Sequence, residues 1–374
     1  MSTLLHPGRR MTGAGLIVGL LAAAVAALAL VETSSGPPAV RTPGSATRRA
    51  PATDVTAAAA RAGLRLLSMA AAASATVPYS GEQVVAWWGP GGASTSVIQV
   101  WHPRHGSVLT HVTNMGVPGA GSSAATAAGG QDPDGILGMT VQMLSLIRAH
   151  YAVAAAGRGM ADGRPARLVE LHRGDGTLAA RFWLDNATGL PLRRETFDAR
   201  SRMISEDAFI DLQVGASALR GMPAPAVERW SAGLSQAQMS RLRADGWLAP
   251  MSLPDGLVLI AAHQATTTAG TVIDLDYSDG LSVVSVFVQR GNLPAALPGW
   301  QEVKVNGREV YASDLSQQSL AWSARGFVYT VIAEAPASTV SEVVTAMPHD
   351  DRPGFWHRIS RGMRRLASWA NPFR

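Results

Sequence analysis

The chain has 374 residues, of which 47% are hydrophobic and 16% charged, so it can form a core large enough for two domains. It contains no cysteine, which excludes disulfide frameworks, thiol chemistry and cysteine-ligated zinc. Six arginines and no acid lie beyond residue 351, and without them the net charge of +5 becomes −1, which argues against a nucleic-acid-binding protein.

The N-terminal part of the chain carries an uncharged apolar run at residues 11–31, directly after Arg9 and Arg10. As a helix this run is long enough to span a bilayer, and the preceding arginines predict that everything after residue 32 lies outside the cytoplasm. We favour a retained single-pass anchor over a cleaved signal peptide, although small residues near the end of the run permit cleavage. Both interpretations place the body on the extracytoplasmic, periplasmic side. Residues 32–53, rich in glycine and proline, are expected to be a flexible linker.

A first domain is expected over residues 54–223. The hydrophobic pattern predicts two helices and a β-meander with one buried face. The predicted helices cover residues 55–75 and 136–149, and a low-complexity loop at 116–135 is expected to be disordered. The predicted strands lie within 84–114 and at 166–173, 178–184, 192–198 and 203–212.

A second, smaller domain is expected after a linker at residues 224–246. Residues 247–348 contain short alternating β patterns, the hairpin signal Asn306-Gly307 and a final helical stretch, which together predict an α+β domain. Residues 349–374 follow as a basic amphipathic tail.

No motif in the chain gathers the side chains that catalysis or metal binding requires. HExxH, GxSxG and P-loop patterns are absent from the sequence. Asp274 and Asp276 share one face of a predicted strand, as an acid pair would, but the adjacent Ser-Asp-Gly turn favours a solvent-facing position. We therefore expect neither an enzyme nor a bound metal or cofactor, and we interpret the chain as a binding or regulatory protein.

Several segments resemble the RseB/MucB-type sigma-E regulatory proteins. The first is RFWLDNATGLPLRRETFDARSRMISEDAFIDLQVG at residues 181–215. Four more lie in the second half: DGWLAPMSLPDGLVLI (245–260), DLDYSDGLSVVSVFVQRG (274–291), NGREVYASD (306–314) and AWSARGFVYTVIAEAP (321–336). The segment at 274–291 is the most specific of them. The resemblance covers roughly residues 55–348.

This resemblance implies both a fold and a function. The fold is α+β, with a LolA-like half-barrel, a curved antiparallel sheet around helices, followed by a smaller α+β domain. The function is that of an extracytoplasmic regulator of an envelope-stress sigma factor, which binds the outer domain of a membrane anti-sigma factor and senses a lipid-like ligand in the half-barrel. The alternative is a lipid or lipoprotein carrier of the cell envelope. A retained anchor disfavours that alternative, because a tethered protein cannot cross the envelope.

Three sets of residues are candidates for these contacts. Strand alternation in the half-barrel selects an apolar, lipid-facing set: Val85, Trp87, Val97, Phe182, Leu184 and Phe209. Aromatic residues of the second domain are candidates for the partner surface: Tyr277, Phe287, Tyr311 and Trp322. Aromatic and basic residues of the tail suit an anionic membrane surface: Trp356, Arg358, Arg361, Arg364, Arg365 and Trp369. The alternative is ordinary core packing for the first two sets and a disordered basic end for the tail.

Overall fold

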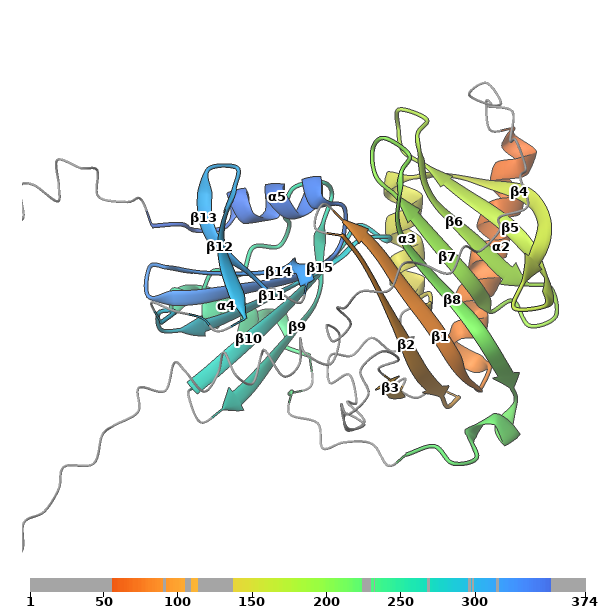
Figure 1. Cartoon of the computed structure of the whole chain (residues 1–374), viewed down its shortest axis with the longest axis horizontal. Helices are drawn as coiled ribbons and strands as arrows, with labels where there is room; N and C mark the ends of the chain where they lie inside the picture. The colour runs from red at the N-terminus through yellow and green to blue at the C-terminus, as the bar shows by residue number, and fades with distance from the viewer. Residues whose placement is uncertain are drawn as a thin grey trace, which may run out of the picture.

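The computed structural model describes residues 56–350, except 90–91, 105–108, 114–136, 224–229, 232, 268–269, 295–296, 298 and 314–315. The predicted anchor, linker and loop, and the candidate residues of the tail, therefore lie outside the described residues. Two antiparallel sheets with few helices follow one another along the chain (Figure 1), which confirms the predicted α+β class. Among the described helices, none is both long and apolar enough to cross a membrane.

The first sheet has eight strands in the order β3-β2-β1-β8-β7-β6-β5-β4. Their bounds are β1 Tyr79–Gly89, β2 Gly92–His102, β3 Leu109–Thr113, β4 Ala152–Ala161, β5 Arg164–His172, β6 Leu178–Asp185, β7 Pro191–Phe197 and β8 Met203–Val214. The predicted meander is present as β5 to β8, and β8 then pairs with β1. The edge strands β3 and β4 do not pair with each other, so this sheet is open.

Two helices accompany the first sheet: α2 (Ala57–Thr76) and α3 (Val141–His150), which contact each other while α2 lies along β4. Helix α3 begins five residues later than the predicted start because Thr140 caps it, accepting a hydrogen bond from the Met143 amide. The sequence pattern places Val141, Leu144 and Ile147 along one face of this helix; Leu144 and Ile147 are buried, whereas Val141, in the first turn, is 76% exposed.

Strand β4 was not predicted, because its sequence AVAAAGRGMA has little β-propensity. Tertiary contact with α2 holds it in place. A Cβ atom at Gly63 would lie only 2.9 Å from the carbonyl carbon of Ala154 and from the amide nitrogen of Ala155. Glycine therefore lets the helix and the strand approach more closely than any other residue would allow.

The second sheet has seven strands in the order β12-β13-β14-β15-β11-β10-β9. The bounds are β9 Val258–Thr267, β10 Gly270–Ser278, β11 Val283–Arg290, β12 Trp300–Val305, β13 Arg308–Ser313, β14 Ser316–Ala324, β15 Phe327–Glu334, α4 Gln236–Ala244 and α5 Ala337–Ala346. One face of this sheet packs with α4 and α5 into a single apolar core, represented by Leu275, Val286, Tyr329 and Val343. We call it the helix-covered face.

The expected solvent-facing position of Asp274 and Asp276 is wrong. Asp274 is only 4% exposed and stands directly opposite buried His263 on the neighbouring strand. Asp276 accepts a hydrogen bond of 2.6 Å from the Ser285 hydroxyl. Burial, reinforced by the charge of Asp276, raises the pKa of the Asp274 carboxyl well above its ordinary value, so the fold favours its neutral form.

Candidate functional site

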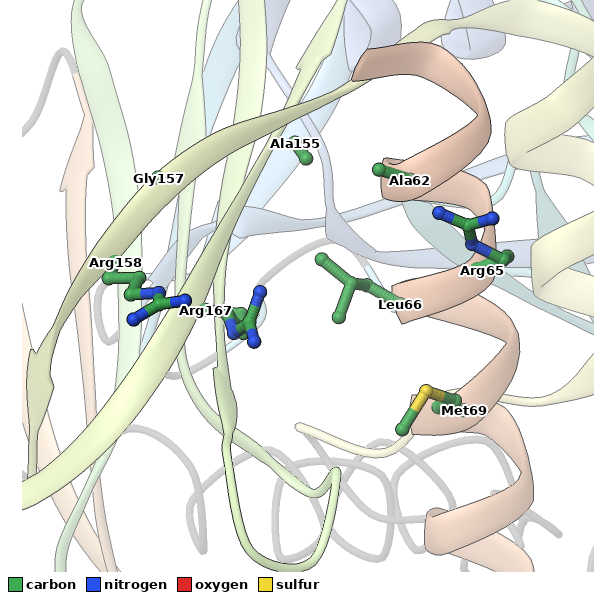
Figure 2. A pocket seen from close by; sticks show the side chains of 8 residues that line it. All are labelled: Ala62, Arg65, Leu66, Met69, Ala155, Gly157, Arg158 and Arg167. Carbon is green, nitrogen blue, oxygen red and sulfur yellow. The ribbon is translucent and has the colours of Figure 1, made fainter. Parts of the chain in front are cut away.

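A cleft of about 300 Å³ opens between α2 and the outer strands of the first sheet (Figure 2). Its volume is at the lower end of the range that small-molecule sites occupy. The lining residues come from α2, β4 and β5: Ala62, Arg65, Leu66, Met69, Ala155, Gly157, Arg158 and Arg167. We call this space the α2–β4 cleft.

The cleft lies beside the closest approach of α2 to β4. They are pressed together at Gly63, but the strand register shifts between Ala155 and Gly157, whose φ is +113°. Such a bulge bends the strand and redirects the residues beyond it. Leu66 then points from the helix toward the strands without filling the space (Figure 2), and Met69 beside it remains 58% exposed.

The charges around the cleft have one sign. Arg65, Arg158 and Arg167 bring three guanidinium groups to an otherwise apolar lining. Arg167 donates a hydrogen bond from Nε to the Asn186 side-chain oxygen at 3.2 Å, and within the described part of the chain none of the three forms an ion pair. An apolar floor with unneutralised arginines is complementary to an amphiphile with an anionic head.

The lipid-facing set predicted from strand alternation does not form one apolar surface. Phe182, Arg194, Asp207 and Val85 are directly opposite one another on four neighbouring strands. A buried ion pair, with Arg194 Nη2 2.8 Å from Asp207 Oδ2, therefore separates the two apolar side chains. Alternation predicts which face a side chain occupies, but it does not predict which charged residues share that face.

The six residues of this set also have different surroundings. Phe182 and Leu184 pack with α2 and α3, whereas Val85, Phe209 and, at its margin, Trp87 belong to a second apolar cluster. Val97 pairs with Val84, so it lies on the opposite face of the sheet from Val85. None of the six is among the described lining of the α2–β4 cleft. Five of them are buried and Trp87 is half-buried, and their contact with a lipid stays a prediction; the cleft is a second candidate site.

Two of the four partner candidates are likewise core residues. Tyr277 is 0% exposed on the helix-covered face, and its hydroxyl donates to the Pro250 carbonyl. Trp322 is 2% exposed, stacks on Tyr329 and donates from Nε1 to the Pro348 carbonyl at 2.8 Å. Both side chains are buried in this structure, and contact of either with a partner stays a prediction.

The other two partner candidates lie on the opposite side of the second sheet. Phe287 pairs with Thr330, Thr330 with Ala321 and Ala321 with Tyr311, so these side chains form one row across four strands. Phe287 and Tyr311 are both half-buried, and the Phe287 ring lies 5.9 Å from that of Trp230. We call this side of the sheet the open face because α4 and α5 cover the other one, although Thr330 and Ala321 in the middle of the row are buried, at 5% and 3% exposure.

Sequence reasoning missed every residue of the α2–β4 cleft. The apolar pattern of α2 indicated only the residues that face the core. Leu66 and Met69, three residues apart on the adjoining face of the helix, were the one sequence signal for the cleft. The opposing residues on β4 were not recognisable, because the strand itself was not predicted. The described residues contain no group of three side chains suited to a metal ion.

Comparison with known proteins relates this architecture to a family. Residues 113–241 match the family model of the MucB/RseB N-terminal domain. This part of the chain is therefore similar to the MucB/RseB N-terminal domain. The curated Pseudomonas aeruginosa protein named sigma factor AlgU regulatory protein MucB is 26% identical over 211 residues, which are 54% of this chain and 62% of MucB. The resemblance to the RseB/MucB-type regulators is thus confirmed.

Solved structures of similar proteins include MucB itself. In its complex with MucA(peri), MucB is 19% identical, and the match covers 77% of this chain and all of that one with a TM-score of 0.45. A LolA superfamily protein from Nitrosomonas europaea is 7% identical, with 73% of this chain and 91% of that chain covered and a TM-score of 0.19.

Proposed function

We propose that this chain is an extracytoplasmic regulator of an envelope-stress sigma factor that binds the outer domain of a membrane-bound anti-sigma factor. The observation that carries the proposal is the match of residues 113–241 to the MucB/RseB N-terminal domain, supported by a curated relative named as a regulatory protein of the sigma factor AlgU. MucB has been crystallised in complex with MucA(peri). By analogy we assign the present chain a partner of the same kind, and the open face with Phe287 and Tyr311 is our candidate surface for it.

The apolar run at residues 11–31 is part of this proposal, as a retained anchor that keeps the chain on the periplasmic side of the cell membrane. The basic tail with Trp356 and Trp369 is proposed to lie on the same membrane. Two proteins held in one membrane meet at a raised effective concentration, so an intrinsically weak contact between their outer domains suffices.

Titration of the full chain against the outer domain of a single-span anti-sigma factor from the same organism tests this proposal. We expect saturable binding by calorimetry, and protection of that outer domain from proteolysis. A folded chain that neither binds at high micromolar concentration nor protects the domain contradicts the assignment.

We further propose that the chain senses an anionic lipid-like ligand in the α2–β4 cleft. The apolar contacts of Leu66 and Met69 suit an acyl chain, and the guanidinium groups of Arg65, Arg158 and Arg167 suit an anionic head. A binding cleft of this kind also serves a lipid carrier, but a retained anchor favours sensing over transport.

Replacing Arg65 and Arg158 together by glutamine should weaken the binding of lysophosphatidylglycerol by roughly thirtyfold, since each cation near an anionic headgroup contributes about 1 kcal/mol. The affinity for zwitterionic lysophosphatidylcholine should change less than about twofold, because the apolar lining is intact. Arg200→Gln, at an exposed arginine outside the cleft, is the matched control. Equal losses for both lipids, or a loss in the control, would place the headgroup elsewhere.

A further inference from the structure

The two domains meet where α3 ends and where the hairpin between β10 and β11 turns. We call residues 278–282 the junction turn. The Tyr151 hydroxyl, just beyond α3, donates to Asp279 Oδ2 at 2.5 Å. The other oxygen, Oδ1, accepts the backbone amides of Leu281 and Ser282 at 2.9 and 2.7 Å. One carboxylate thus shapes the turn and attaches it to the first domain.

The backbone of the junction turn lies directly against α3. A Cβ atom at Gly280 would be 2.7 Å from the Ile147 amide nitrogen and 2.9 Å from the Met143 carbonyl oxygen, and the φ of Gly280 is +99°. A side chain at this position therefore meets both a helix backbone and an unfavourable backbone conformation. His150 adds a second polar contact, with Nδ1 3.2 Å from the Asp279 carbonyl oxygen.

The residue after this glycine belongs to the core of the other domain. Leu281 is 7% exposed and joins an apolar cluster with Leu67 of α2 and with Leu144 and Ile147 of α3. Leu66, which lines the α2–β4 cleft, packs against the same cluster. The cleft and the junction turn are therefore two ends of one continuous packed cluster, which is the physical connection that coupling between two sites uses.

We propose that the junction turn holds the two domains in one orientation, and that an amphiphile entering the α2–β4 cleft releases it by moving α2 against α3. This inference rests on the lipid-sensing part of the proposed function and specifies how that site is regulated. A ligand shifts such an equilibrium only if it binds the released form more tightly. By linkage, a variant that releases the junction turn binds the amphiphile more tightly, by at least about fivefold.

The experiment measures the distance between the domains in the full chain. Because the chain has no cysteine, Gly174→Cys and Glu342→Cys introduce the only two sites for spin labels, one exposed position in each domain. Pulsed dipolar spectroscopy should give one narrow distance distribution, and lysophosphatidylglycerol should broaden or shift it. Gly280→Ala should broaden it without lipid and bind lysophosphatidylglycerol at least about fivefold more tightly.

Two further variants make the test specific. Gly326→Ala is the matched control, since Gly326 also has a positive φ, of +78°, but no atom near the added Cβ; its distances should match the unsubstituted protein. Tyr151→Phe removes only the hydrogen bond from the Tyr151 hydroxyl to Asp279. This variant replaces Gly280→Ala in the test if Gly280→Ala does not fold.

Each result decides a different step. A narrow, unshifted distribution in folded Gly280→Ala or Tyr151→Phe overturns the role of the junction turn. Saturable lipid binding that leaves the distribution unchanged overturns the coupling, while the proposed lipid site stands. No lipid binding overturns the lipid site and the coupling together, and the variant distances still decide whether the turn holds the domains.

Discussion

Replacing Arg194 by methionine will destabilise the chain by about 3–5 kcal/mol, because a buried carboxylate loses its charged partner. Arg194 Nε and Nη2 lie 2.9 and 2.8 Å from Asp207 Oδ2. The two residues are only 6% and 1% exposed, so water cannot replace the lost contact. The Glu334 carboxylate of the second domain lies 3.8 Å from Arg194 Nη2 and also loses a neighbour. Urea unfolding followed by circular dichroism measures the loss.

This loss should depend on pH in a defined direction. Burial raises the pKa of the Asp207 carboxyl, and Arg194 partly opposes that rise. An aspartate whose pKa is raised by folding binds its proton more tightly in the folded state, so its contribution to stability improves as the pH falls through the folded pKa. Without Arg194 the pKa of Asp207 rises further. The loss of unfolding free energy in the variant should therefore be clearly smaller at about pH 4 than at about pH 7.

The double variant Arg194→Met/Asp207→Asn is the control for this interpretation. Removing both charges should recover much of the stability, since the penalty comes from the unpaired carboxylate rather than from the lost attraction. A deficit below about 1 kcal/mol, or one equal at both pH values, would show that the pair is not buried as described.

Replacing Trp322 by alanine will unfold or strongly destabilise the second domain, with a loss of about 3–5 kcal/mol. The indole packs on Tyr329 and on His349, with ring centroids 5.6 and 5.1 Å away, and its Nε1 hydrogen bond to Pro348 is also lost. Phe287→Ala, on the open face, should cost only about 1–2 kcal/mol because the ring is half-buried.

Phe287→Ala also tests the partner surface, because the variant should remain folded. If the open face carries the partner, folded Phe287→Ala weakens binding of the anti-sigma outer domain by at least about tenfold, as loss of a central aromatic anchor does. Val141→Ala, at an exposed apolar residue of the first domain, should bind normally. Unchanged affinity in Phe287→Ala, with the fold retained, removes the open face as the partner surface.

Local sequence was sufficient for most elements of this protein. Alternating β patterns and turn residues predicted strands of both sheets, and the Asn306-Gly307 turn lies where expected, with φ of +46° and +78°. Family-specific segments predicted the relationship to the MucB/RseB proteins. The strands and the turn depend on side-chain periodicity and backbone preferences over a few residues, which local sequence carries. The relationship to the family came from the resemblance of longer segments.

Tertiary structure alone decided the rest. Strand β4 depends on Gly63 of a distant helix, and the α2–β4 cleft depends on a bulge in that strand. Asp274 is buried although it adjoins a polar turn, and the ion pair of Arg194 with Asp207 interrupts a face that alternation makes uniformly apolar. The physical reason is the same in each case: the energy of a polar or small residue is set by the groups that pack against it, and those neighbours come from parts of the chain far away in sequence.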